Sequence, residues 1–386
     1  MSEFDDIRPY NDDEVKPVLN RLINDRECID TLVKLKFPKS AAYLAPVLRK
    51  LARSKLNKVA GKIHTVADFQ HFMEGMVKDV VDNTIDELSV SGLERLDKDQ
   101  AHLFISNHRD ITMDSAMVNF SLYHAGFGTL RIAAGDNLLT KPFASDLMRL
   151  NKSFIVNRSA TSLREKLKAA KLLSRYIHHS VVEDGESVWI AQREGRAKDG
   201  IDKTNPAIVS MLALSRKKPE PLEEHFRRIR IVPVTISYEY DPCGFDKARE
   251  LYEIETNGSY TKGEQEDVAS IAKGITGYKG DVHLTFGKIL NDAYESTDEV
   301  HAELDRQIDR NYVLHASNCF AYEMLEGKIP NVPIGKTQTP FADLDLSERR
   351  KTYKKYIDSC PQQHLKILLR CYANPVYKHL ELTGAT

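Results

Sequence analysis

A histidine followed by acidic residues stands in the segment Phe104-Ile-Ser-Asn-His-Arg-Asp110. His108 follows an apolar run that predicts a strand, and it precedes a run that predicts a helix. Sites in α/β sheets gather at the carboxyl ends of strands, where a histidine can act as a general base near neutral pH. The imidazole needs a partner that fixes its orientation, usually a carboxylate, and Asp110 and Asp114 are both near. Taken alone, such a histidine is more often structural.

Two further segments carry residue types that suit a phosphorylated substrate. Arg158 ends the run Ser153-Phe-Ile-Val-Asn-Arg158, and an arginine at a strand end can bind a phosphate through two hydrogen bonds. A second run follows the apolar segment 187–191: there Gly195 would allow close backbone approach to a ligand. The cations Arg196 and Lys198 suit a phosphate, and the carboxylate of Glu194 could bind a hydroxyl. Each run alone could equally be a solvated surface.

A proline interrupts the apolar run Ile231-Val-Pro-Val-Thr-Ile236. Because proline lacks a donor for the strand ladder, Pro233 predicts an edge strand or a bulge. Such irregularities occur next to functional sites.

The order of apolar runs and amphipathic segments predicts an α/β fold, a mixed central sheet flanked by helices, with helical N-terminal and C-terminal extensions. Strands are expected at 102–106, 130–134, 153–157, 187–191, 229–236 and 282–286, and helices at 113–123, 142–150, 162–179 and 206–215. One long helix is expected from 296 towards 325, and two short basic helices at 347–358 and 361–372. We expect a helical region over 1–90, an α/β domain over 91–290 and a helical region over 291–386.

The bulk composition excludes several classes of protein. The 386 residues are 41% hydrophobic and 29% charged with a net charge of -1, which argues against a disordered chain and a nucleic-acid binder. Five cysteines without C-x-x-C spacing fit a reducing compartment, and no metal-ligand set or cofactor is expected. The acidic N-terminus predicts no signal peptide, and no run of about 18 apolar residues predicts a membrane span. A cytoplasmic location is expected.

A basic stretch over residues 34–62 contains nine Lys and Arg residues and no acidic one. Apolar residues alternate with the cations at helical spacing, which predicts basic amphipathic helices. Such helices can adsorb to an anionic membrane surface. The alternative is a helix packed on the body of the protein with merely solvated lysines.

In order and spacing, the four clusters resemble the four sequence blocks shared by glycerol-3-phosphate and 1-acylglycerol-3-phosphate acyltransferases. The resemblance covers roughly residues 90 to 290, and the run Ile132-Ala-Ala-Gly-Asp-Asn-Leu138 also resembles bacterial members. The four blocks correspond to Asn107-His108-Arg109 with Asp114, Phe154–Arg158, Glu194-Gly195-Arg196 with Lys198, and Val232–Ile236. Five residues separate His108 from Asp114, where the family has four, so Asp110 is the reserve partner. In the third block Arg196 directly follows Gly195, where the family usually has a spacer.

The resemblance implies acyl transfer from an acyl thioester (acyl-CoA or acyl carrier protein) to a hydroxyl of glycerol 3-phosphate or a related phosphorylated glycerol. His108 would be the general base and Asp114 its orienting partner. The implied substrate-binding residues are Arg109, Arg158, Glu194, Gly195, Arg196 and Lys198. A protein of this kind would lie on the inner face of the cell membrane. The alternatives are a 1-acylglycerol-3-phosphate acceptor, a hydrolase that uses water as acceptor, and a non-catalytic membrane-surface protein that retains the fold.

Overall fold

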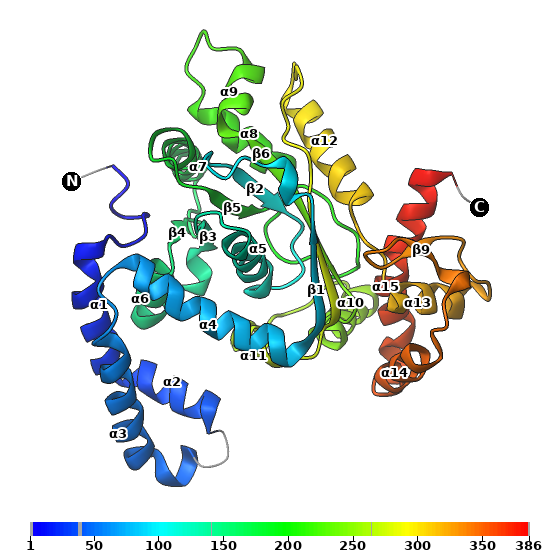
Figure 1. The fold of residues 1–386 in the computed structure, drawn as a ribbon, viewed down its shortest axis with the longest axis horizontal. Coiled ribbons are helices and arrows are strands. Elements are labelled where there is room, and N and C mark those ends of the chain that lie inside the picture. Colours follow the sequence, from blue (N-terminus) through cyan, green and yellow to red (C-terminus); the bar gives the residue numbers. More distant parts are fainter. Residues whose placement is uncertain (1–2, 38–40, 140, 264, 385–386) are drawn as a thin grey trace. The chain divides into compact units, whose positions relative to one another are not determined.

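The computed structural model of the chain describes residues 3–37, 41–139, 141–263 and 265–384. Figure 1 labels the helices and strands along the chain. The chain forms two compact units, each made of two separate stretches. Unit 1 comprises Met1–Met76 and Thr129–Tyr176, and unit 2 comprises Val77–Gly128 and Ile177–Thr386. The expected division into three consecutive regions stays a prediction.

Unit 1 opens with helices. Its first helix carries apolar residues at helical spacing, and the stripe from Val15 to Ile23 is buried. Val15 and Leu19 share one core with Phe69 and Leu150. The Asp25 side chain accepts a hydrogen bond from the backbone N–H of Cys28 and so caps the second helix. The helices are α1 (Asp12–Asn24), α2 (Arg26–Lys36), α3 (Ala41–Ala60) and α4 (Val66–Thr84), the last of which continues into the residues of unit 2.

Unit 1 also contains two parallel strands, β3 (Arg131–Gly135) and β4 (Ser153–Val156). Helix α6 (Pro142–Leu150) connects them, with its proline in the first turn, where no amide donor is needed. Helix α7 (Leu163–His178) follows β4. It begins with the capping box that the sequence predicts: the N–H of Glu165 donates to Oγ of Ser162, and the N–H of Ser162 donates to the Glu165 carboxylate, each at 3.2 Å.

The strands of unit 2 run in the order β1-β7-β6-β2-β5. Strand β2 pairs in parallel with β5 and β6 on its two sides, and β6 pairs antiparallel with β7. All four residues of β2 are buried, as expected for a strand covered on both faces. The predicted mixed α/β sheet is therefore confirmed. The strands are β1 (Ile85–Ser91), β2 (Leu103–Ser106), β5 (Val188–Ala191), β6 (Ile231–Tyr238) and β7 (Gly280–Phe286).

Pro233 lies in β6, between β7 and β2, so the expectation of an edge strand or a bulge is wrong. Strand β7 ends at Phe286, opposite Val234. The next residue, Gly287, donates its N–H to the carbonyl of Pro233 at 2.8 Å. Proline lacks an amide hydrogen for strand pairing. In β6 that hydrogen would be needed only at the last position of the pairing with β7, so this central strand tolerates Pro233.

The helices of unit 2 surround these strands. They also form the C-terminal part of the unit. The C-terminal helices share a core that includes Phe320, Tyr353 and Leu368. The helices are α5 (Met113–His124), α8 (Pro206–Leu212), α9 (Leu222–Ile229), α10 (Gly244–Asn257), α11 (Glu266–Thr276), α12 (Thr297–Arg310), α13 (Ala316–Glu326), α14 (Ser347–Asp358) and α15 (Gln362–Thr383). A short hairpin of β8 (Pro333–Ile334) and β9 (Thr339–Pro340) precedes α14.

The single long helix expected from 296 towards 325 is wrong, because α12 and α13 are separate helices. The break falls at residues 311–315. His315 adopts an extended backbone and starts α13 with a capping box, in which its N–H donates to Oδ1 of Asn318 at 2.8 Å. The last helix was expected to be short, but α15 continues through Pro375 to Thr383.

Within the described ranges, none of the helices combines the length and the apolar composition that a membrane span requires. The same residues contain no group of three His, Cys, Asp or Glu side chains placed to hold a metal ion.

Candidate active site

His108 and Asp114 are held together at the carboxyl end of β2. Nδ1 of His108 lies 2.9 Å from Oδ2 of Asp114, which sits in the first turn of α5. The Asp114 side chain is fully buried, whereas that of His108 is 14% exposed. His108 thus contacts Asp114, the first candidate for its orienting partner, and the catalytic role of the pair stays a prediction.

Asp110 has a different role, because its side chain caps the N-terminus of α5. Its Oδ1 accepts hydrogen bonds from the backbone N–H groups of Thr112 and Met113, at 2.9 and 2.8 Å. These are donors that a helix N-terminus otherwise leaves unsatisfied. Burial, followed by the nearby charge of Asp114, raises the pKa of Asp110 above its ordinary value. Asp110 is thus a buried cap, and Asp114 is the carboxylate that contacts His108.

The second ring nitrogen of His108 is available. Among the residues that the structure describes, Nε2 has no hydrogen-bond partner, while Nδ1 binds Asp114. The indole of Trp189, on the neighbouring strand β5, packs edge-on against the imidazole with 6.2 Å between ring centroids. The backbone N–H of Ala197 donates to the carbonyl of His108 at 2.7 Å. The third sequence block therefore contacts the first directly.

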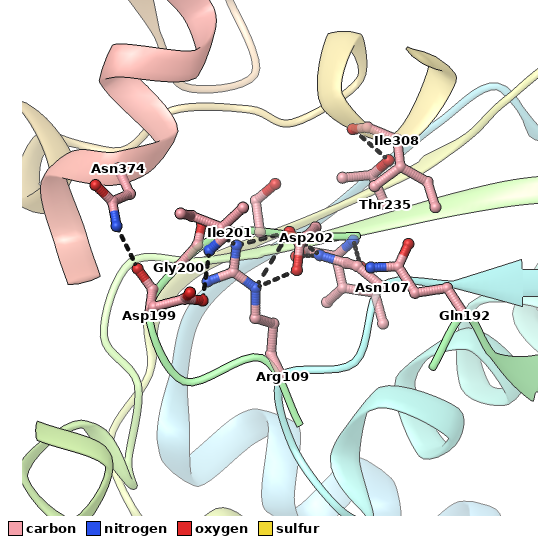
Figure 2. Close-up of polar contacts among 12 residues, drawn as sticks. Asn107, Arg109, Gln192, Asp199, Gly200, Ile201, Asp202, Thr235, Ile308 and Asn374 are labelled. Carbon is pink, nitrogen blue, oxygen red and sulfur yellow. Dashed lines mark hydrogen bonds and ion pairs between the residues drawn. The ribbon is translucent and has the colours of Figure 1, made fainter. Parts of the chain in front are cut away.

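The two residues that flank His108 share one carboxylate. Figure 2 shows Asp202 facing both the guanidinium of Arg109 and the amide of Asn107. Arg109 donates to Asp202 through Nη2 at 2.6 Å and through Nε at 3.0 Å, and Nδ2 of Asn107 donates to it at 3.0 Å. Asn107 also exchanges two hydrogen bonds with the backbone of Ile236 on β6. These contacts fix the backbone on both sides of the histidine.

The Arg109 guanidinium therefore already has hydrogen-bond partners within the protein. Its Nη2 also donates to the carbonyl of Gly200 at 3.1 Å, and its guanidinium lies over the ring of Tyr312. Burial opposes its charge, but the attraction of Asp202 and Tyr312 raises the pKa of Arg109 above its ordinary value. These contacts favour a role in holding the loop. Substrate binding by Arg109 stays a prediction.

Helices α10 and α15 contact the two loops that Arg109 and Asp202 join, the loop after β2 and the loop after β5. The buried Lys247 of α10 donates to the carbonyl of Arg109 at 2.7 Å and pairs with Asp241. Asn374 of α15 donates to the carbonyl of Asp199 at 2.7 Å (Figure 2). A Cβ on Gly200, which has a φ of +80°, would lie 2.0 Å from the carbonyl oxygen of Cys371. Glycine is thus required here because α15 packs directly on the loop.

The loop after β5 holds the predicted phosphate ligands of unit 2. Gly195 has a φ of +71°, a conformation that other residues rarely adopt, and a Cβ there would meet no described atom within 4 Å. Glycine is needed for the turn, not for packing. Arg196 is half-buried, and its Nη2 donates to Oγ of Ser270 on α11 at 3.3 Å. Its Nη1 is buried and has no acceptor in the described part of the chain.

The other two residues of this block differ in their surroundings. Nζ of Lys198 pairs with the carboxylate of Glu250 on α10, and the lysine side chain is 30% exposed. Glu194 is exposed. Arg196 thus has unused hydrogen-bonding capacity for an anion, whereas the charge of Lys198 is already matched.

Arg158 lies in unit 1, in the loop after β4. Its N–H and that of Ser159 donate to the carboxylate of Asp136, each at 3.1 Å. A Cβ on Gly135 would lie 2.9 Å from Nε of Arg158, so the guanidinium passes over that glycine. The second block and the Gly135-Asp136 run are therefore in contact with each other.

Three residues of the site were not predicted from the sequence: Asp202, Tyr238 and Lys247. Each contacts the His108 segment from at least 93 residues away, at 93, 124 and 138 positions respectively. No local spacing reveals such partners. A weak signal existed for Tyr238 alone, because it ends the fourth block's strand.

Comparison with known families agrees with this geometry. Residues 87–237 match the family model described as Acyltransferase, and this range contains the His108–Asp114 pair and the loop from Glu194 to Lys198. The segment is an acyltransferase domain with an α/β sheet. Within that class, it is similar to the glycerolipid acyltransferase described next.

The chain is 30% identical over 219 residues to a "Glycerol-3-phosphate acyltransferase" of Pseudoalteromonas translucida (strain TAC 125). The aligned part is 54% of this chain and 25% of the relative, so the chain spans about a quarter of that protein's length. A solved structure, the 1-acyl-sn-glycerophosphate (LPA) acyltransferase PlsC from Thermotoga maritima, is 15% identical and superposes with a TM-score of 0.37. That superposition covers 77% of this chain and 92% of the other.

Proposed function

We propose that this protein transfers a fatty acyl group from an acyl thioester to a hydroxyl of glycerol 3-phosphate or a related phosphorylated glycerol. The observation that carries the proposal is the buried Asp114 carboxylate on Nδ1 of His108, with Nε2 left without a partner among the described residues. A histidine held in this way presents Nε2 as the basic nitrogen.

In the proposed reaction, Nε2 of His108 takes the proton of the acceptor hydroxyl while its oxygen attacks the thioester carbonyl. The tetrahedral intermediate collapses with cleavage of the C–S bond, and the proton on Nε2 passes to the leaving thiolate. Asp114 stabilises the imidazolium between the two proton transfers. The attacking oxygen belongs to the substrate, so no covalent enzyme intermediate is required.

The acceptor phosphate is assigned first to Arg196, because its buried Nη1 has no acceptor within the described residues. A guanidinium with an unused N–H is suited to a phosphate oxygen. Lys198, which is already paired with Glu250, and Arg158 are assigned supporting contacts on the strength of the resemblance. Glu194 would accept a hydrogen bond from a glycerol hydroxyl, next to the Gly195 turn.

We assign the membrane contact to one face of α3 in unit 1. The α3 face consists of Tyr43, Leu44, Val47 and Leu51, whose exposed fractions are 88%, 52%, 58% and 62%. Exposed cations stand on the same helix, at Lys50, Arg53, Lys55 and Lys58. Large exposed apolar side chains beside cations suit the interface of an anionic bilayer. The cationic residue Lys39 lies outside the described residues.

This surface supports peripheral binding at the inner face of the cell membrane. The alternative, a helix packed on the body with solvated lysines, accounts for Val59 and Ala60, which pack against the core of unit 1. It does not account for the exposed apolar α3 face. Arg49, by contrast, is paired with Asp30 and is not counted as a lipid contact.

The function is tested by a panel of acceptors with both acyl-CoA and acyl carrier protein as donors. We expect thiol release that depends on glycerol 3-phosphate and exceeds that with 1-acylglycerol 3-phosphate, glycerol or no acceptor. A preference for 1-acylglycerol 3-phosphate would assign the second acceptor class. Release that is independent of acceptor would indicate a hydrolase, and vesicle binding without any release would indicate a non-catalytic surface protein.

A further inference from the structure

The two oxygens of Asp114 have separate partners. Oδ2 accepts from Nδ1 of His108 at 2.9 Å and from the backbone N–H groups of Arg109 and Asp110 at 2.6 and 2.9 Å. Oδ1 accepts from the hydroxyl of Tyr238 at 2.8 Å. Three donors therefore converge on one oxygen, and the Tyr238 side chain on β6 is the partner of the other among the described residues.

This division matters because a carboxylate turns easily about its Cβ–Cγ bond. Donors on Oδ2 alone fix the position of that atom but restrain the plane of the carboxylate weakly. The Tyr238 hydroxyl binds the opposite oxygen and fixes the plane. The orientation of Asp114 in turn decides whether the Nδ1–H of His108 meets a well-aligned acceptor.

The surroundings of Tyr238 favour the protonated hydroxyl, which is the form that donates a hydrogen bond. Asp114 is fully buried and Tyr238 is buried. Burial, followed by the charge of Asp114, raises the pKa of Tyr238 well above its ordinary value. The hydroxyl therefore keeps its proton at neutral pH and can donate it to Asp114.

We propose that Tyr238 is a positioning residue for the reaction, which it serves by holding the Asp114 carboxylate so that His108 carries its proton on Nδ1 and offers Nε2 to the acceptor. This inference rests on the proposed function for its kinetic consequence, but the tautomer of His108 can be measured without any turnover. Tyr238 acts through Asp114 and does not touch the reacting atoms.

The test compares Tyr238→Phe with Tyr353→Phe. Tyr353 is also buried, and its hydroxyl has no hydrogen-bond partner among the described residues. Each substitution removes one buried oxygen, but only the first removes a hydrogen bond to Asp114. We expect kcat to fall about tenfold in Tyr238→Phe, as for the loss of one hydrogen bond to a charged group, with both KM values within about twofold. Tyr353→Phe should keep kcat within about twofold of the wild-type value.

The spectroscopic readout is the ¹⁵N NMR spectrum of histidine-labelled protein, in which the His108 signals are assigned by their loss in His108→Gln. In the neutral ring of the wild-type protein we expect the proton on Nδ1, and in Tyr238→Phe a mixture of the two tautomers. An unchanged tautomer together with unchanged kcat would overturn the proposal. So would a wild-type spectrum with the proton on Nε2, which needs no variant at all. A tautomer change in a protein that transfers no acyl group would support the positioning role and refute the proposed function.

Discussion

Arg109 and Asp202 form a buried, two-point ion pair directly beside His108, with N–O distances of 2.6 and 3.0 Å. The same carboxylate binds Asn107 on the other side of the histidine. The pair thus ties the loop after β5 to the end of β2. Because both side chains are nearly inaccessible to water, at 13% and 4% exposed, removal of one partner leaves an unmatched buried charge.

The first prediction follows from this pair. Asp202→Asn should destabilise the folded protein by about 3–5 kcal/mol, since Arg109 then stays buried without its counter-ion. The double variant Arg109→Met/Asp202→Asn should lose less than the sum of the single variants. Urea unfolding at neutral pH measures both quantities. A matched change in the exposed pair of Glu348 and Lys351, Glu348→Gln, should have little effect.

The same variants separate a structural role for Arg109 from substrate binding. If Arg109 holds the loop, Arg109→Met lowers the unfolding free energy. A raised acceptor KM in a variant of wild-type stability would contradict the structural role and support the predicted contact of Arg109 with the substrate.

The second prediction distinguishes the two carboxylates near His108. Asp114→Asn should lower kcat by about 10³–10⁴-fold, because the imidazole loses the partner that fixes its tautomer. Asp110→Asn should stay within about threefold of the wild-type rate, because an asparagine oxygen can also cap α5. Steady-state rates of the two variants measure this. A severe loss in Asp110→Asn with activity retained in Asp114→Asn would reverse the assignment.

Asp110 also has a pH signature. Since its pKa is raised in the folded state, chiefly by burial, its charge opposes folding at neutral pH. Its contribution to stability is greatest below the unfolded pKa, about 3.9, and is lost as the pH rises through the folded value. Asp110→Asn should therefore be more stable than the wild type at pH 7, with a difference that shrinks towards pH 4.

The third prediction concerns His315, the buried residue that starts α13. Burial lowers its pKa to about 4, against about 6.5 in the unfolded chain. The stability that this neutral ring allows is present above pH 6.5 and is lost as the pH falls through 4, for a total of about 3 kcal/mol. Urea unfolding from pH 7.5 to 4.5 should show a decline that is shallower in His315→Gln. Equal slopes in the two proteins would rule out this origin.

The fourth prediction concerns the phosphate ligands. Arg196→Ala should raise the acceptor KM by about 10–100-fold and leave the donor KM unchanged, because a charge-assisted hydrogen bond to the acceptor is lost. Lys198→Ala should have a smaller effect, since its charge is matched by Glu250. Initial rates at varied acceptor and donor concentrations decide this. An effect of Arg196→Ala on the donor alone would assign the guanidinium to the thioester instead.

The fifth prediction tests the α3 face. The double variant Tyr43→Ser/Leu51→Ser should weaken binding to phosphatidylglycerol-containing vesicles at least about tenfold, because two large apolar contacts are lost. Val268→Ser, a change at a 59% exposed apolar residue on α11, should leave the affinity unchanged. Co-sedimentation at two salt concentrations measures both. Equal binding by all three proteins would exclude α3 as the lipid contact.

The fold could be predicted largely because apolar runs mark the strands of this chain. Strands β2 to β7 were expected close to where they lie, and so was the α/β class. Strand β1 was missed because its burial pattern is mostly exposed or intermediate, and the polar residues at 85–91 give no apolar run. Helices α9, α10 and α11 were also missed, and the break before α13 depends on a cap at His315 that the helical pattern conceals.

The candidate site, like the fold, could be predicted from the sequence only in part. His108 and Asp114 are near in sequence, so their contact follows from the turn between β2 and α5. Asp202, Tyr238 and Lys247 come to them through strand pairing and helix packing, which no local pattern records. The resemblance assigns Arg109 to the substrate, and its contact with Asp202, 93 positions away, could not be foreseen from the sequence.

The most direct measurement of the central claim is the stoichiometry of acyl transfer by the wild-type protein and by His108→Ala. Thiol release and acylated glycerol phosphate should be followed together, with a radiolabelled acyl thioester and glycerol 3-phosphate. We predict one acylated product per thiol released by the wild type, and no acceptor-dependent release by a folded His108→Ala variant. Equal product formation by the two proteins would contradict the role of His108, and thiol release without acylated product would contradict the transfer itself.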